Sequence, residues 1–93
     1  MFIRYGNSLV NIDKSFHIRI DLYEKVNGLG SYTGKKCSIT FYSGFDYPEG
    51  YERFYFDDEE TTQKVFDEIN TRIICKEYYL NVDYFIWKMK EFE

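Results

Sequence analysis

Histidine and cysteine, the usual ligands of zinc sites, are scarce in this chain, and so are two other residue types. Histidine occurs once, cysteine twice and proline once, and alanine does not occur at all. One histidine and two distant cysteines cannot supply the paired ligand spacings of a zinc site, so we expect no metal. Cys37 and Cys75 form neither a disulfide framework nor a Cys-x-x-Cys motif. We therefore expect reduced thiols, as is usual in the cytosol.

Long apolar runs are also absent. No stretch approaches the roughly 20 residues of a membrane-spanning helix, and the N-terminus lacks the continuous apolar core of a signal peptide. The net charge of −4 and the pI near 5.0 disfavour binding to nucleic acids or anionic membranes through bulk charge. These absences predict a soluble cytoplasmic protein with no cofactor and no membrane partner.

Aromatic side chains are abundant instead. Ten tyrosines, nine phenylalanines and one tryptophan make up 22% of the 93 residues. A domain of this size fully encloses roughly 20–25 residues, so some rings, above all tyrosines, must remain exposed. Exposed apolar patches of this kind are enriched at interfaces. Amino acids with A/T-rich codons are also frequent, which indicates an A/T-rich genome and accounts for part of the aromatic excess.

Period-two alternation predicts strands in the first two thirds of the chain. Apolar and polar side chains alternate from Ser15 to Glu24, and again at 37–42 and 53–56, as in strands with one buried face. The glycine-rich segment 25–36 and the turn segment 44–50 connect these strands.

A hairpin is predicted at the N-terminus. Phe2–Tyr5 and Ser8–Ile12 are joined by Gly6-Asn7, a dipeptide that suits a tight turn. Together with the three later strands, this hairpin predicts an antiparallel meander of four to five strands.

The period then changes from two to that of a helix. An apolar stripe recurs at helical spacing, formed by Val65, Phe66, Ile69 and Ile73. Asp57 followed by Glu60 resembles a capping box, so we expect a helix over about 58–75. Cys75, at the end of the stripe, would be a small core residue.

The tail fits two structures. A helix capped by Asn81 would align Val82, Phe85, Ile86, Met89 and Phe92, whereas a strand would align Leu80, Val82, Tyr84 and Ile86. The helix is favoured because no turn residue interrupts 87–93. The whole chain, residues 1–93, is thus predicted to be one α+β domain: a meander of four to five strands, a helix over about 58–75 and a second short helix or strand.

Two segments resemble known proteins. The opening, MFIRYGNSLVNID, resembles the starts of short uncharacterised prokaryotic and phage proteins built as a β-meander followed by a helix. The segment ERFYFDDEETTQKVFDEI resembles the close of pleckstrin-homology-like domains, in which a C-terminal helix plugs a curved sheet. The chain is shorter than those domains, and beyond Lys35-Lys36 it lacks the basic hairpin loop of phosphoinositide binders. The resemblances imply a fold class and no activity.

Catalytic patterns are not met. In the stretch from Gly28 to Lys36, the glycine spacing and the missing hydroxyl depart from a P-loop, which favours a flexible hairpin loop. A Cys–His pair would need His17 beside Cys37 or Cys75. The strand periods place His17 and Cys37 on opposite sheet faces, and Cys75 follows the apolar stripe of the predicted helix. A small Cys/His enzyme is therefore the least favoured hypothesis, and we expect no catalytic residue.

The polar strand faces point to a binding function. They carry tyrosine and arginine, which often contribute most of the energy of an interface. We therefore predict a non-catalytic protein-binding module whose partner is another protein or a second copy of the chain. The predicted contact residues, on the open sheet face and the following loop, are Arg19, Tyr23, Tyr42, Phe45, Asp46, Tyr47, Arg53 and Tyr55.

The biological setting of this module and one alternative function remain open. The coding bias and the N-terminal resemblance suggest an accessory or inhibitor protein of a phage or mobile element, with inhibition of host defence as one form. The alternative function is a platform for single-stranded nucleic acid, because rings stack on bases and arginine pairs with phosphates. The negative net charge and the lack of a clustered Lys/Arg stripe argue against that alternative.

Overall fold

The computed structural model describes residues 1–22, 37–43 and 51–91, and only the backbone of residues 14–16 and 43. Several predicted features lie outside these residues. They are the contact residues Tyr23, Phe45, Asp46 and Tyr47, the glycine-rich loop, the turn segment and Phe92.

Strands precede the long helix, as predicted, and the α+β class is confirmed. In chain order the described elements are β1 (Phe2–Tyr5), β2 (Ser8–Asn11), the 3-10 helix η1 (Ile12–Lys14), β3 (Ser15–Asp21), β4 (Cys37–Ser43), β5 (Tyr51–Phe56), α1 (Glu59–Ile74), β6 (Tyr79–Asn81) and α2 (Val82–Glu91).

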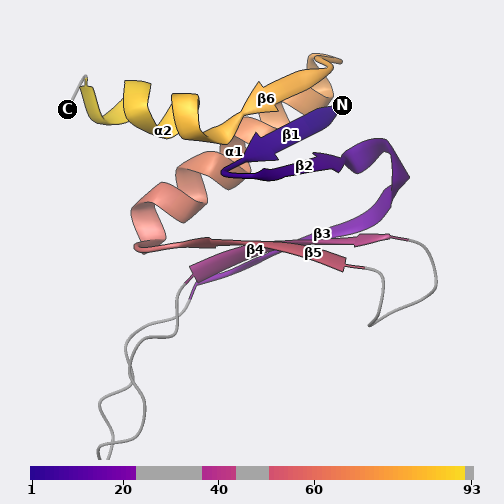
Figure 1. Ribbon diagram of the computed structural model, residues 1–93, viewed down its shortest axis with the longest axis horizontal. Helices are drawn as coiled ribbons and strands as arrows, with labels where there is room; N and C mark the ends of the chain where they lie inside the picture. The colour runs from indigo at the N-terminus through magenta and orange to yellow at the C-terminus, as the bar shows by residue number, and fades with distance from the viewer. Residues whose placement is uncertain (23–36, 44–50, 92–93) are drawn as a thin grey trace, which may run out of the picture.

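The strands form two three-stranded sheets (Figure 1). Sheet A has the order β2-β1-β6, and sheet B has the order β3-β4-β5. Sheet B is an antiparallel meander, and β1–β2 is the predicted hairpin, with Gly6 at φ +58° in its turn. Two features were not predicted. The strands divide into two sheets rather than continuing as one meander, and β6 returns after α1 and pairs with β1 in parallel, so that Ile3 lies opposite Leu80.

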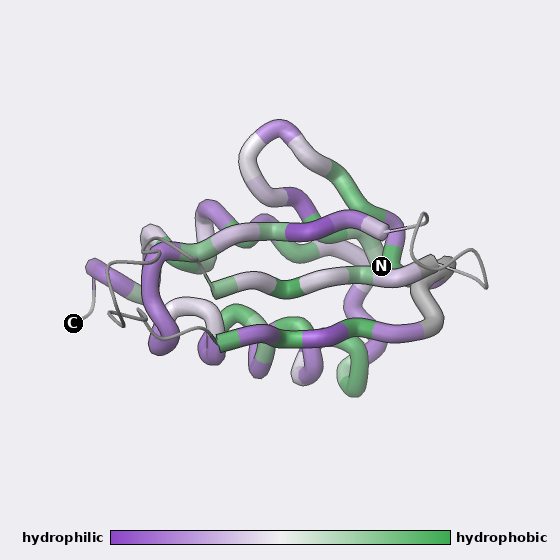
Figure 2. Tube along the Cα trace, turned by 90° about the horizontal axis from the view of Figure 1, so that it is seen from below, coloured by the Kyte–Doolittle hydropathy of each residue, from purple (hydrophilic) through white to green (hydrophobic). Residues whose placement is uncertain are grey.

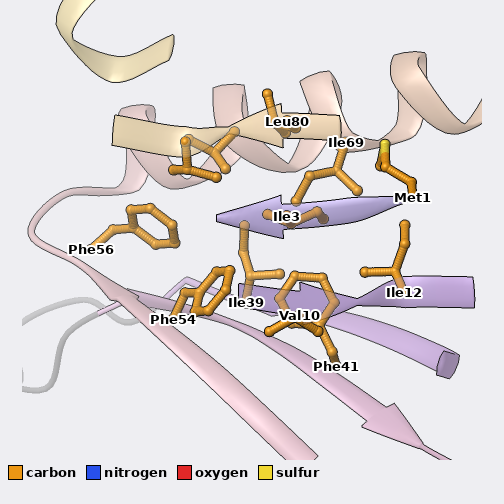
Figure 3. Close-up of a cluster of buried hydrophobic side chains, with 12 residues drawn as sticks. Met1, Ile3, Val10, Ile12, Ile39, Phe41, Phe54, Phe56, Ile69 and Leu80 are labelled. Carbon is orange, nitrogen blue, oxygen red and sulfur yellow. The ribbon is translucent and has the colours of Figure 1, made fainter. Parts of the chain in front are cut away.

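The core lies between the two sheets and α1 (Figure 3). Ile3 of sheet A and Ile39 of sheet B are both fully buried, and Ile69 of α1 is 2% exposed. Figure 3 shows side chains from all three elements gathered in one cluster. The remaining members of this cluster are Met1, Val10, Ile12, Phe41, Phe54, Phe56, Val65, Leu80 and Val82. A single core is what a chain of 93 residues can build.

The start of α1 differs from the prediction by one residue. Asp58, not Asp57, is the N-cap: its Oδ1 accepts from the Thr61 amide at 2.7 Å, and its Oδ2 accepts from the Thr61 hydroxyl at 3.0 Å. The Thr62 hydroxyl also donates to the Asp58 carbonyl at 2.7 Å, and Thr62 is fully buried. The two threonines therefore give Asp58 hydrogen bonds that the predicted pair of Asp57 and Glu60 would lack.

The end of α1 corrects a second expectation. Cys75 is exposed rather than part of the core, and Ile73 is 45% exposed. The helix ends because Lys76 adopts the left-handed region at φ +58°. The Glu77 amide then donates to the Arg72 carbonyl at 2.9 Å, which closes the last helical turn before the chain continues to β6. The apolar stripe thus stays buried at Val65 and Ile69 and emerges into solvent by its last turn.

Both structures considered for the tail occur, one after the other. Tyr79–Asn81 is a strand, and Val82–Glu91 is a helix. The predicted cap is confirmed, because Asn81 Oδ1 accepts from the Tyr84 amide at 3.1 Å. No helix within the described ranges is long and apolar enough to span a membrane.

Replacement of Asp58 tests the helix cap. We expect Asp58→Ala to lower the free energy of unfolding by about 0.5–2 kcal/mol at pH 7, because the first-turn amide loses its acceptor. Asp58→Asn is the matched control, since its side-chain oxygen can still accept this bond. Urea denaturation measures both values, and equal losses for the two variants would contradict the assigned cap.

Comparison of the wild type with Asp58→Asn also gives a pH dependence of stability. Hydrogen bonds from the Thr61 amide and hydroxyl hold the pKa of Asp58 below its ordinary value. The stabilisation is therefore present above the unfolded-state pKa of about 3.9 and is lost as the pH falls through the lower folded-state pKa. Acidification from pH 5 to pH 3 should destabilise the wild type more than Asp58→Asn, and an equal loss would overturn this assignment.

Candidate functional site

The outer face of sheet B brings several predicted contact residues together. Figure 2 views the molecule from this side and shows hydrophobic and hydrophilic residues alternating along the strands. The cross-strand register aligns His17 with Tyr42 and Tyr51 in one row. Arg19 and Arg53 lie opposite Thr40 in the next row. We call this set the Tyr/Arg face: His17, Arg19, Tyr42, Tyr51, Arg53 and Tyr55.

Arg53 is held by groups on two neighbouring strands of this face. Its Nε donates to Thr40 Oγ1 at 2.9 Å, and its guanidinium carbon lies 5.0 Å from the centre of the Tyr51 ring. A side-chain hydrogen bond with Tyr55 is the main cause that raises the pKa of Arg53 further, so this residue stays cationic. Thr40 belongs to the central strand and is fully buried. The Arg53 side chain therefore extends over β4 to reach it, while Arg53 itself remains exposed.

The other predicted residues of this face differ in exposure. Arg19 is exposed, and its guanidinium binds Asp21 Oδ1, with Nε at 2.9 Å. Tyr55 is 52% exposed, whereas Tyr42 is only 7% exposed, between the rings of His17 and Tyr51. Arg19, Arg53 and Tyr55 can therefore contact a partner directly, while Tyr42 supports the rings beside it.

Tyr51 belongs to the face but was missing from the predicted set. It is 46% exposed and lies under the Arg53 guanidinium. The signal was present in the sequence, because Tyr51 has the same strand phase as Arg53 and Tyr55.

A hollow separate from the Tyr/Arg face, which we call the C-terminal groove, lies where α1, β6 and α2 meet. Its volume is about 560 Å³. The residues that line it are Arg72, Tyr79, Asn81, Tyr84, Phe85, Lys88 and Met89. Sequence reasoning did not find this groove, because it requires the tail to form a strand and a helix in succession.

A third cluster, around Tyr5, is occupied with structural contacts. The Tyr5 ring stacks on Phe56 with centres 4.9 Å apart, and its hydroxyl donates to the Tyr55 carbonyl at 2.7 Å. Burial first, and then the charges of Asp83 and Asp57, raise the pKa of the Tyr5 hydroxyl. Asp83 also accepts from the Gly6 amide at 2.7 Å. This cluster ties sheet A to sheet B, which accounts for its polar groups.

The pairing of β3 with β4 separates His17 from Cys37, the thiol considered as a nucleophile in the sequence analysis. His17 lies opposite Tyr42, five residues along β4 from Cys37, which is about 17 Å at the rise of a strand.

Among the residues that the structure describes, no three His, Cys, Asp or Glu side chains are placed to hold a metal ion.

The two thiols should differ in reactivity. Cys75 is exposed after the end of α1, whereas Cys37 is 2% exposed in β4. We expect a disulfide reagent such as Ellman's reagent to label one thiol per native chain, and both thiols after unfolding in urea. Cys75→Ser is the control and should abolish the rapid phase. Rapid labelling of Cys37 in the folded protein would contradict its burial and reopen the enzyme hypothesis.

Similarity to known proteins does not assign the chain to a family. A scan against protein-family models finds no match, and searches of curated proteins and of solved structures find none either. The function is therefore inferred from the geometry of the surfaces described above.

Proposed function

We propose that this protein is a non-catalytic module that binds another protein through the Tyr/Arg face of sheet B. The observation that carries this proposal is the exposed, interlocked group of Tyr51, Arg53 and Tyr55. Tyrosine and arginine are enriched among residues whose truncation weakens interfaces most. On β5 these three side chains project from consecutive outward positions of a paired strand.

The two arginines of the face are preorganised for binding. Arg53 is held by the Thr40 hydroxyl and the Tyr51 ring, and Arg19 is held by Asp21. Binding costs about 0.5–1.5 kcal/mol for each flexible side chain that it immobilises. Since these arginines are already restrained, their contribution to an interface would be offset less by lost conformational freedom.

The charge of the face favours an acidic partner. The face carries two arginines, and Arg19 has the carboxylate of Asp21 beside it, whereas the whole chain has a net charge of −4. Electrostatic complementarity of this kind mainly raises the association rate and selects the partner. In a symmetric dimer through this face, each patch would meet a copy of itself, so the arginines of the two copies would repel each other. A different, acidic protein is therefore the better partner.

The setting of this interaction is part of the proposal. The A/T-rich coding bias and the resemblance of MFIRYGNSLVNID to short phage and prokaryotic proteins support a cytoplasmic accessory or inhibitor protein of a phage or mobile element. A host defence protein is the partner that such an inhibitor would have.

The geometry favours protein over single-stranded nucleic acid. A stacking platform needs open rings beside unpaired cations. Here Tyr42 is 7% exposed, Arg53 already covers the Tyr51 ring, and Arg19 is bonded to Asp21. Tyr55 is 52% exposed and, among the described residues, has no arginine over its ring, whereas Tyr51, although 46% exposed, has one face of its ring covered by Arg53.

Matched variants test the proposed face. Partners captured from host lysate with the wild-type chain are identified by mass spectrometry, and the affinity of each purified partner is then measured. Tyr55→Ala and Arg53→Ala should each weaken binding about 30-fold, corresponding to the roughly 2 kcal/mol of an interface hot spot. The controls are Tyr78→Ala, at a position 82% exposed, and Arg4→Ala, on the outer face of sheet A.

Each outcome has a defined meaning. Controls that bind as tightly as the wild type, together with weakened face variants, support the proposal. Equal affinity for all five proteins would overturn it. Binding of labelled single strands at low salt, lost in Arg53→Ala and at moderate salt, would assign the face to nucleic acid instead.

A further inference from the structure

The C-terminal groove has the dimensions of a small-molecule site. Its volume of about 560 Å³ falls within the roughly 300–1,000 Å³ typical of ligand pockets. Three elements form it, since Arg72 comes from α1, Tyr79 from β6 and Tyr84 from α2. It lies apart from the Tyr/Arg face, whose residues come from β3, β4 and β5.

The lining of the groove is mostly apolar. Phe85 and Met89 are partly buried, while Tyr79 and Tyr84 are 42% and 54% exposed. Tyr79 faces outward because the neighbouring strand residue, Leu80, points into the core. Tyr84 and Lys88 are one helical turn apart on α2 and therefore share a face. An apolar ligand body would cover the two exposed rings.

The charges of the groove are distributed unevenly. The lining contains two cations, Arg72 and Lys88, and no carboxylate. Arg72 is already neutralised: its Nε lies 2.7 Å from Glu68 Oε2, and its Nη1 lies 3.6 Å from Glu77 Oε2. The Arg72 Nη1 also donates to the Tyr79 carbonyl at 3.0 Å, so this side chain acts as a fixed wall.

Lys88 differs from Arg72 in its surroundings. Its Nζ lies 5.7 Å from the centre of the Tyr84 ring. Within the described ranges it has no carboxylate partner, although the chain as a whole is acidic. An ammonium at the rim of an apolar hollow is complementary to an anionic group on an otherwise apolar ligand.

We propose that the C-terminal groove binds a small organic carboxylate with an apolar body, either acyl or aromatic. The body lies between the Tyr79 and Tyr84 rings and over Phe85 and Met89, and the carboxylate pairs with Lys88. The volume and the single unneutralised cation together favour this occupant over a second copy of the chain. The site stands independently of the proposed protein partner, because no residue is shared between the two surfaces.

Trp87 provides a built-in reporter. It is the only tryptophan in the chain, and its ring lies 5.9 Å from that of Tyr84, which lines the groove. The probes are decanoate and 1-naphthoate, each titrated below its aggregation concentration while Trp87 emission is recorded. The matched controls are decan-1-ol and decyltrimethylammonium, which keep the apolar chain and change the charge. Because the protein is acidic overall, non-specific adsorption would favour the cation rather than the carboxylate.

The expected result is a saturable change in emission, with decanoate bound more tightly than decan-1-ol and decyltrimethylammonium. Lys88→Gln should weaken decanoate binding about three- to fivefold, as expected for a solvent-exposed ion pair, and leave decan-1-ol unaffected. Lys88→Glu should reverse the preference toward decyltrimethylammonium. Lys90→Gln, on the same helix but outside the groove lining, is the control and should bind as the wild type does. Comparison of decanoate with 1-naphthoate distinguishes an acyl from an aromatic body.

Three results would overturn the proposal. They are an unchanged Trp87 emission with both carboxylates, equal affinity for the anionic and cationic probes, and Lys88→Gln binding decanoate as tightly as Lys90→Gln. A dimer in sedimentation analysis that dissociates in Tyr84→Ala and is insensitive to decanoate would assign the groove to a second copy. Circular dichroism of each variant distinguishes lost binding from lost folding.

Discussion

The burial of two small sheets against one shared set of side chains is the constraint on which this structure depends. Each sheet has three strands, and a sheet of that size needs another apolar layer to be stable. Ile3 supplies that layer from sheet A, Ile39 from sheet B and Ile69 from α1. Sheet A is closed by β6, which pairs with β1 only after the chain has passed through α1. The N-terminal hairpin is therefore completed by residues near the C-terminus.

Contacts at the periphery of this core hold the two sheets together. Tyr5 stacks on Phe56 and donates its hydroxyl hydrogen bond to the backbone of β5. The N-terminal ammonium is close to Asp13, with Met1 N at 2.6 Å from Oδ1, beside the residues that lead into sheet B. These contacts join the start of the chain to its middle, so the relative position of the sheets does not rest on apolar packing alone.

The shared core also determines which surfaces are left for binding. All three strands of sheet B contact α1 on the core side, so the opposite face presents its tyrosines and arginines outward. The path from α1 through β6 to α2 leaves the C-terminal groove at the other side of the molecule. The aromatic abundance of the chain is accordingly divided. Phenylalanines such as Phe41 and Phe54 fill the core, and tyrosines such as Tyr55 and Tyr84 remain accessible.

Local patterns in the sequence predicted the elements well but not their partners. Alternation identified β5 through Phe54 and Phe56, and helical spacing identified α1 through Val65 and Ile69, because burial of one face leaves a period in the sequence. The parallel pairing of Ile3 with Leu80 leaves no such local signal, since it joins residues far apart in the chain.

The candidate site likewise combines residues that local sequence patterns predict with residues whose role depends on tertiary contacts. The strand phase of Arg53 and Tyr55 could be read directly, whereas the burial of Tyr42 depends on its cross-strand neighbours His17 and Tyr51. The groove was not predictable, because Arg72 and Lys88 are brought together only by packing of α2 near α1.

Native-state hydrogen exchange of the central strands tests the shared core most directly. If one core supports both sheets, the most protected amides of β1 in sheet A and β4 in sheet B should exchange with the same opening free energy. Replacement of Ile69 in α1 by alanine should lower both values together, by about 2–5 kcal/mol. Exchange of β1 at a much lower free energy, with β4 still protected and unaffected by the substitution, would show that the sheets fold separately and would contradict this account.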